Sequence, residues 1–313
     1  MDVALNLFLL IGGLAVALVA SDRAVAYTRA FASALGAPSF VVGVVLVSIG
    51  TDLPEIANSI AAHVQGEGDV NVGDSVGSTL TQYTLVLGLF PLVVPVVLIR
   101  RRQIGLVSAF TMAGLGLTIV FVADGWLGRY EGASLVLLWA VLSYVLVRML
   151  PGESEAHPPR VRLARPFQQV GVILITLGFV GFGATVAVRA LVRLAELVGV
   201  PEFVIAFFGA SLGTSAPEIV VDVMALMRGA PAIALGDALG SSFVDSTLSI
   251  GIGPLVAPAE VTPRLAVVGT AYALAAVGIV GLLLGVRRRL DRNAAAVLMG
   301  LYVFAYVVLI GAS

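Results

Sequence analysis

The sequence contains no cysteine, no lysine, and only two histidines and two tryptophans. Without cysteine the chain has neither a disulfide framework nor thiol chemistry. Charged residues make up only 12% of the chain, and the longest basic runs are the triplets Arg100–Arg102 and Arg287–Arg289. Nucleic-acid binding requires a concentrated basic face, so this composition argues against nucleic acid as a partner.

Hydrophobic residues make up 59% of the 313 residues, which is far too apolar for a soluble domain of this length. The sequence therefore predicts an all-α polytopic protein of the cell membrane, with the lipid bilayer as its surroundings. The N-terminus lacks the positive segment of a secretory signal peptide, and we interpret the first apolar segment as a retained span. With about 20 residues per span, we expect ten transmembrane helices, at 3–20, 38–63, 73–98, 104–123, 132–150, 169–196, 202–227, 231–257, 262–286 and 293–311.

An internal repeat organises the chain. A gap-free shift of 163 positions aligns Gly50-Thr51 with Gly213-Thr214, and many other Gly, Pro and acidic residues fall into the same register. The halves are residues 1–150 and 169–313, joined by a linker at 151–168 that is rich in proline and charge. Each half contains five expected spans, an odd number, so the second copy enters the membrane upside down. Such inverted repeats are typical of secondary transporters, which bind substrate near the bilayer midplane.

The distribution of arginine predicts the orientation. Fourteen of the 18 basic residues fall in or next to the loops after the odd-numbered spans. The positive-inside rule places those loops and the linker in the cytoplasm, and both termini outside.

Acidic residues interrupt the second expected span and are costly at bilayer depth, so they indicate a function. Ser48, Asp52 and Glu55 lie at i, i+4 and i+7, and Thr51 is four residues before Glu55, so one helix face carries all four. Pro54 lacks an N–H, which predicts a kink that leaves a backbone carbonyl free to bind a cation. The seventh span repeats the pattern with Ser211, Thr214, Ser215, Glu218 and a proline, Pro217; Asp222 lies one turn further on.

Two more polar stripes complete this set. The third span presents Asp74, Ser78, Thr81 and Gln82, and the eighth presents Asp237, Ser241, Asp245 and Ser249. All these ligand types are oxygens, which favours a hard cation such as calcium over zinc or copper. His63 is interpreted as an interfacial residue near a helix end, not as a ligand.

Two pairs of motifs resemble the two alpha repeats of the cation/calcium antiporter superfamily, specifically prokaryotic sodium/calcium exchangers: GTDLPE with GDSVGS, and GTSAPE with GDALGS. The resemblance implies exchange of calcium for sodium by alternating access, with these ions as cargo, no organic cofactor and no obligate protein partner. It also implies that eight residues are metal ligands: Thr51, Glu55, Ser78, Gln82, Thr214, Glu218, Ser241 and Asp245. The shared helix faces add Ser48, Asp52, Ser211 and Ser215 to the predicted ligand set.

Two departures from the family pattern concern the coupling ion. Asp52 stands where the family usually has serine, and Gln82 stands where asparagine is usual. The extra carboxylate makes a proton-coupled antiporter for calcium or another divalent cation the main alternative. A cation channel fits less well, because inverted kinked helices favour alternating access. An intramembrane aspartyl protease is rejected, because Asn71 and Ala234 replace the glycine that such enzymes have three residues before each aspartate.

Several polar and small residues have a structural interpretation. Asp74 and Asp237 follow glycine near expected helix starts, so they are either N-caps or ligands. Ser59, Thr84 and Ser246 are expected to bond to the carbonyl one turn back. Gly77 and Gly240 are expected to allow close helix packing.

The carboxylate count gives a first prediction. Asp52, Glu55, Glu218 and Asp245 carry up to four negative charges against the two of one calcium ion, so at least one of them stays protonated with calcium bound. Asp52→Ser should therefore change the coupling and the pH dependence of calcium transport. Transport unchanged in both respects would contradict this hypothesis.

Overall fold

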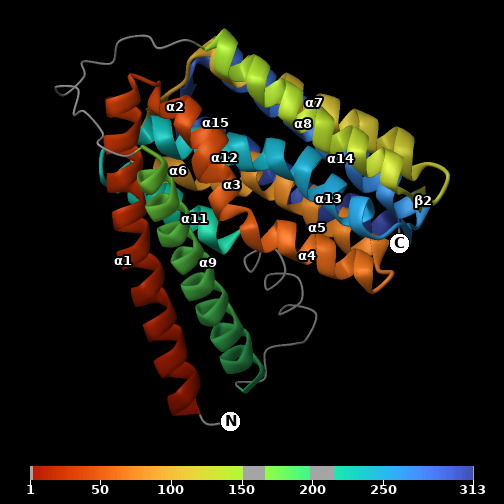
Figure 1. Cartoon of the computed structure of the whole chain (residues 1–313), viewed down its shortest axis with the longest axis horizontal. Helices are drawn as coiled ribbons and strands as arrows, with labels where there is room; N and C mark the ends of the chain where they lie inside the picture. Colours follow the sequence, from red (N-terminus) through yellow and green to blue (C-terminus); the bar gives the residue numbers. More distant parts are fainter. Residues whose placement is uncertain (1–2, 151–165, 198–214, 313) are drawn as a thin grey trace. The chain divides into compact units, whose positions relative to one another are not determined.

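The computed structural model describes residues 3–150, 166–197 and 215–312. Within these ranges the regular structure is almost entirely helical (Figure 1). Four two-residue strands form two antiparallel pairs: β1 (Val97–Leu98) with β4 (Arg289–Leu290), and β2 (Trp126–Leu127) with β3 (Ala259–Glu260). The chain divides into two compact units, residues 1–53 with 152–237 and residues 54–151 with 238–313. These units differ from the two sequence halves, because each unit takes segments from both copies of the repeat.

The first unit is built on two long helices that lie side by side, α1 and α9 (Figure 1). Small residues allow their close approach, since a Cβ atom at Gly13 would lie 2.6 Å from the carbonyl oxygen of Gly183. The helical segments of this unit are α1 (Val3–Leu35), α2 (Ser39–Val42), the π-helical turn η1 (Gly43–Val47), α3 (Ser48–Thr51), α9 (Pro166–Leu197), α11 (Ala216–Met227) and the first half of α12 (Pro231–Val244).

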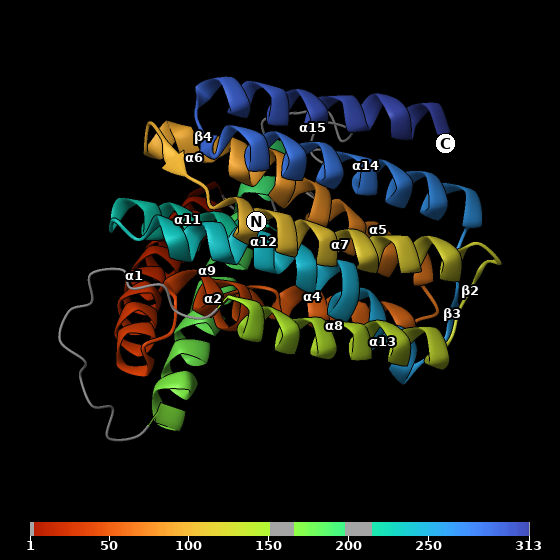
Figure 2. The ribbon, with the colours of Figure 1, turned by 90° about the horizontal axis from the view of Figure 1, so that it is seen from above.

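The second unit contains the remaining helices, and α7, α14 and α15 run next to one another in it (Figure 2). Its segments are α4 (Leu53–Val64, from Pro54 on), α5 (Gly68–Thr81), η2 (Gln82–Val86), α6 (Leu87–Val93), α7 (Arg101–Val122), α8 (Arg129–Met149), the second half of α12, η3 (Asp245–Ser249), α13 (Ile250–Val256), α14 (Pro263–Arg287) and α15 (Arg292–Ala312). All four strands belong to this unit.

The sequence-based prediction for the first helix, 3–20, was wrong in extent. Helix α1 continues to Leu35, because no proline or glycine interrupts the alanine-rich segment after residue 20. It stops before Gly36, whose positive φ of 65° ends the helix. Asp22 and Arg29, on the added turns, contact Arg228 through an ion pair of 2.5 Å and a bond to its carbonyl oxygen of 2.9 Å.

The N-cap interpretation of Asp74 and Asp237 was also wrong. Helices α5 and α12 begin at Gly68 and Pro231, so both aspartates lie inside a helix. The helices begin early because the turns before them are tight, with Gly66 and Gly229 in left-handed conformations at φ of 80° and 65°.

The bounds of many elements repeat with the shift found in the sequence. Adding 163 to the bounds of α4, α5, η2, α6, β2 and α8 gives those of α11, α12, η3, α13, β4 and α15. The duplication is therefore visible in the backbone, including its irregular turns.

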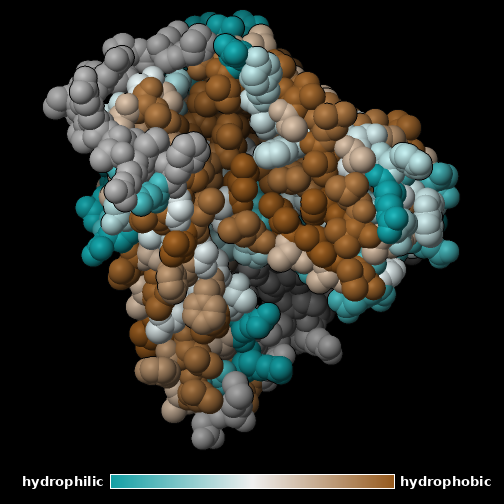
Figure 3. All heavy atoms as spheres, viewed as in Figure 1, coloured by the Kyte–Doolittle hydropathy of each residue, from teal (hydrophilic) through white to brown (hydrophobic). Residues whose placement is uncertain are grey.

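The surface is that of a membrane protein. In the described part of the chain, six helices are long and apolar enough to cross a bilayer, or seven if the broken pair Ser39–Thr51 and Leu53–Val64 is one span. Large hydrophobic side chains are exposed on them, among them Phe8, Leu137 and Phe182. Hydrophobic residues cover much of the face in Figure 3, and hydrophilic ones gather at its edges.

Two equivalent glycines give a stability prediction. A Cβ atom at Gly236 would lie against the carbonyl oxygen of Phe40 and 3.1 Å from Gly43 Cα, whereas nothing described lies within 4 Å of a Cβ at Gly73, its counterpart in the first repeat. We expect Gly236→Ala to destabilise the protein by about 1 to 3 kcal/mol through overpacking, and Gly73→Ala to change little. Thermal unfolding in detergent measures both variants, and equal melting temperatures would contradict the packing described here.

Candidate cation site

The helix of the second expected span breaks at Asp52, as the proline at position 54 predicted. Asp52 has φ −80° and ψ 4°, outside helical values, and α4 begins at the next residue. Ser215 has nearly the same conformation, φ −88° and ψ 10°, before α11. Pro54 and Pro217 each occupy the first turn of the helix that follows, where the missing N–H costs nothing. Both copies of the motif therefore place a polar side chain at a helix break.

The first unit contains a buried acidic cluster at these breaks. Carboxylate oxygens of Asp52 and Glu218 lie within 4.8 Å of each other, and both side chains are fully buried. Thr51 donates from its hydroxyl to Asp237 Oδ1 at 3.2 Å. Ser48 lies one turn before Asp52 and donates to Val44 O at 2.5 Å. Ser215 is also fully buried, and its hydroxyl has no hydrogen-bond partner among the described residues.

The second unit contains its own polar cluster. Gln82 donates to Asp245 Oδ2 at 3.4 Å and accepts a hydrogen bond from Ser242 Oγ at 2.9 Å. Glu55 lies within electrostatic reach of Asp245 and is buried. Neither oxygen of Glu55, nor Asp245 Oδ1, has a hydrogen-bond donor in the described part of the chain. The hydrogen-bonded series Ser242–Gln82–Asp245 thus fixes one carboxylate and leaves its second oxygen available.

Gln82 and Asp245 are the first residues of π-helical turns, η2 and η3. Such turns are rare and often occur at functional sites, because they displace a side chain from the regular helical position. The sequence did not predict them. Their equivalence by the 163-residue shift supports a shared role for the two residues.

The donor set fits a hard cation. The buried polar groups are carboxylate, hydroxyl and amide oxygens, without nitrogen or sulfur ligands, as calcium and sodium prefer. Among the groups that interact with Glu55, Asp222, Asp237 and Asp245, no basic side chain occurs. An isolated buried carboxylate costs several kcal/mol or more. A bound cation or proton therefore has to neutralise these groups.

The remaining predicted ligands are buried or lie outside the described residues. Ser78 and Ser241 are buried in α5 and α12. Ser211 and Thr214 lie outside the described part of the chain.

Residues given a structural interpretation mostly have that role. Thr84 and Ser246 bond to the backbone carbonyls of Leu80 and Phe243. Ser59 instead accepts from the N–H of Gly253 at 3.1 Å, and His63 is buried with Nδ1 2.8 Å from the carbonyl oxygen of Ala257.

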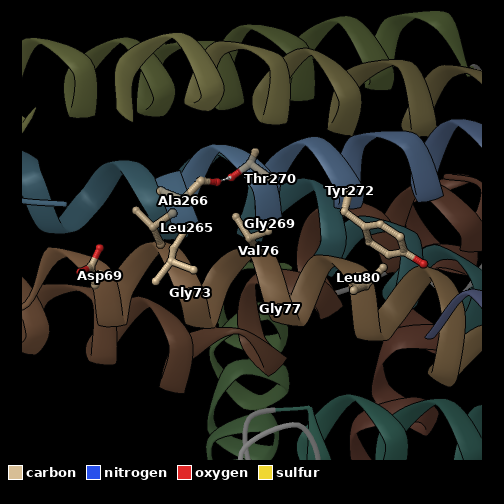
Figure 4. A pocket seen from close by; sticks show the side chains of 11 residues that line it. Asp69, Gly73, Val76, Gly77, Leu80, Leu265, Ala266, Gly269, Thr270 and Tyr272 are labelled. Carbon is tan, nitrogen blue, oxygen red and sulfur yellow. Dashed lines mark hydrogen bonds between the residues drawn. The ribbon is translucent and has the colours of Figure 1, made fainter. Parts of the chain in front are cut away.

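The interpretation of Gly77 as a close-packing glycine was wrong. A Cβ atom there would meet no described atom within 4 Å, and Gly77 lines a groove of about 280 Å³ between α5 and α14 (Figure 4). The polar groups at its edge are already bonded: Asp69 accepts two hydrogen bonds from Thr262, and Thr270 donates to Ala266 O. This groove is apolar and is not the cation site.

Two polar residues in these clusters were missed by the sequence-based ligand set. Ser242 belongs to the cluster of the second unit because it donates a hydrogen bond to Gln82, and it directly follows the motif serine Ser241. Asp222 was noticed only as lying one turn after Glu218. Comparison of the two repeats distinguishes Asp222 as an added acid, because its counterpart in the first copy is the uncharged Ser59.

A family model described as sodium/calcium exchanger protein matches the chain twice, at residues 5–148 and 168–311. The chain belongs to the sodium/calcium exchanger family. The two matched segments correspond to the two halves of the sequence repeat. The family consists of transporters, which confirms that the chain is not an enzyme and that its substrates are cations.

Several known proteins are similar to this chain over most of its length. Inner membrane protein YrbG of Escherichia coli is 28% identical and covers 82% of this chain and 81% of its own. Sodium/calcium exchanger MaX1 of Methanosarcina acetivorans is 27% identical and covers 98% of this chain and 99% of its own. The solved structure of the exchanger NCX_Mj, soaked with sodium and strontium, superposes with a TM-score of 0.79 at 24% identity over 98% of this chain and 99% of that chain. This last similarity shows that the two proteins share a fold.

Proposed function

We propose that this member of the family is a secondary active antiporter that exchanges calcium for sodium across the cell membrane by alternating access. The observation that carries the proposal is the pair of buried, oxygen-only clusters at repeat-related helix breaks and π-helical turns. The groups that interact with Glu55 and Asp245 include no basic side chain, as a site for a removable cation requires. The similarity to the sodium/calcium exchanger MaX1 supports this proposal.

The architecture belongs to the same proposal. Ten transmembrane helices form two inverted repeats, 1–150 and 169–313, with a cytoplasmic linker at 151–168 and both termini outside. The repeated element bounds and the double family match support two copies, and the arginine distribution supports the orientation.

The proposed ligands are four acids and eight neutral polar residues that the sequence motifs name. The carboxylates of Asp52, Glu55, Glu218 and Asp245 provide charge, and the hydroxyl and amide groups complete the coordination. The full set is that named from the sequence: Ser48, Thr51, Ser78, Gln82, Ser211, Thr214, Ser215 and Ser241 together with the four acids.

Proton coupling is the second candidate, and Asp52 is the observation that favours it. Asp52 adds a carboxylate within 4.8 Å of Glu218, where the equivalent position of the second repeat has Ser215. Two carboxylates at this distance favour uptake of a proton when no cation lies between them.

Transport in proteoliposomes separates these functions. An outward sodium gradient should drive calcium uptake into vesicles that contain the protein, and a pH gradient alone should not. Glu55→Gln should abolish uptake, because α4 contains no second acid that could replace the carboxylate of Glu55. Uptake driven only by the pH gradient would show that the coupling ion is the proton and not sodium. Calcium flux without any counter-ion would indicate a channel.

The series Ser242–Gln82–Asp245 gives a finer prediction. Ser242→Ala removes the donor that orients Gln82, so calcium affinity should fall about twofold to tenfold, the effect of one hydrogen bond of roughly 0.5 to 1.5 kcal/mol. Ser246→Ala is the matched control, because that hydroxyl bonds to Phe243 O in the same region. Calcium titration by calorimetry measures both variants. Equal affinities in the two would show that Gln82 does not need Ser242.

A further inference from the structure

Two further acids face each other in the first unit. Asp222 on α11 and Asp237 on α12 are both fully buried. Asp237 is the group that interacts most strongly with Asp222, and Asp52 is the next charged group. Both oxygens of Asp222 and Oδ2 of Asp237 lack a hydrogen-bond donor among the described residues. Among the described residues, Asp237 interacts with two groups: its partner acid Asp222, and the hydroxyl of Thr51, which donates to Asp237 Oδ1 at 3.2 Å.

The other repeat shows how the same position is satisfied without an ion. Asp74, the counterpart of Asp237, accepts a hydrogen bond of 2.7 Å from Asn58 Nδ2. In the second repeat Val221 replaces Asn58, which removes the donor, and Asp222 replaces Ser59, which adds a second acid. The first change removes a hydrogen-bond donor, and the second adds negative charge next to Asp237.

Such an arrangement is unfavourable unless a cation is bound. Two carboxylates that face each other in a buried position repel one another and lose their hydration. Carboxylates from two helices with a hydroxyl alongside are the oxygen ligands of a hard divalent ion. Neither Asp222 nor Asp237 belongs to the transport ligands above, so the pair is not accounted for by the exchange site.

We propose that Asp222 and Asp237, with Thr51 and Asp52 alongside, form a second cation site within the first unit, which binds a divalent ion of the calcium class. The two acids that define this site come from the second repeat and are not among the transport ligands, whereas Thr51 and Asp52 come from the first repeat and are shared with the proposed transport site.

Counting bound calcium tests this proposal. Equilibrium dialysis of the purified full-length protein in detergent against radioactive calcium should give two ions per chain. Asp222→Asn and Asp237→Asn should each reduce the number to one, and Glu55→Gln should remove the other ion. The double variant of Glu55→Gln with Asp222→Asn should bind none. Asp74→Asn, the counterpart of Asp237→Asn, is the control and should retain two.

Thermal unfolding keeps the test independent of misfolding. Without calcium, Asp222→Asn should melt at or above the wild-type temperature, because an amide donor then faces Asp237. Saturating calcium should raise its melting temperature less than that of the wild type. Asp222→Ser, which restores the residue of the first repeat, should give the same count as Asp222→Asn. The proposal is overturned if the wild type and Asp222→Asn bind the same number of calcium ions, which would mean that the two acids share only a proton.

Discussion

Every polar group at bilayer depth needs a partner, and the architecture of this chain follows from that constraint. Lipid offers no hydrogen bonds, so a carboxylate there requires a donor, a proton or a cation. Asp74 has a donor in Asn58, whereas Glu55, Asp222 and one oxygen of Asp245 have none among the described residues. The difference separates structural acids from those available to ions. The helix breaks at Asp52 and Ser215 interrupt the regular series of backbone hydrogen bonds next to the acids. Backbone polar groups there need partners for the same reason as the carboxylates do.

Duplication preserved the backbone and allowed the side chains to diverge. The break, the left-handed glycine and the π-helical turn occur at equivalent positions in both copies. Proline favours the break, and glycine permits the left-handed turn. The residues on that frame differ: Asp52 corresponds to Ser215, Gln82 to Asp245 and Ser59 to Asp222. Two similar backbones therefore carry different charges. A symmetric frame suits alternating access, and unequal side chains allow ions of different charge to be distinguished.

The sequence predicted the features that depend on composition and on proline. The apolar segments, the break near Pro54, the duplication and the acids of the two motifs all follow from residue type and spacing. The length of α1 did not follow, because a hydropathy count finds the part of a helix that crosses the bilayer and not its polar continuation to Leu35. The start of α5 at Gly68 was missed for a similar reason, since the tight turn at Gly66 leaves room for an additional helical turn.

Side-chain partners were the least predictable part of the site. The π-helical turns at Gln82 and Asp245 have no residue signature, because they arise where two helices must keep packing past an extra residue. The bond from Ser242 to Gln82 depends on which face of α12 meets α5, and spacing alone selected its neighbour Ser241. The open surroundings of Gly77 likewise depend on the distance to α14, which no single helix encodes.

The acids are distributed unequally between the two units, and the difference bears on the mechanism. The second unit has Glu55 and Asp245, with Gln82 supplying an amide donor where another acid would repel. The first unit has four buried acids: Asp52, Glu218, Asp222 and Asp237. The neutral polar groups that the motifs place beside them are hydroxyls, such as that of Thr51. One divalent ion balances two carboxylates, so it balances the pair Glu55 and Asp245 but not the four acids of the first unit. Additional positive charge must accompany folding of the first unit, as protons or a second cation. The coupling ion is therefore determined chiefly by the residues that differ between the repeats, and not by the motif glutamates that they share.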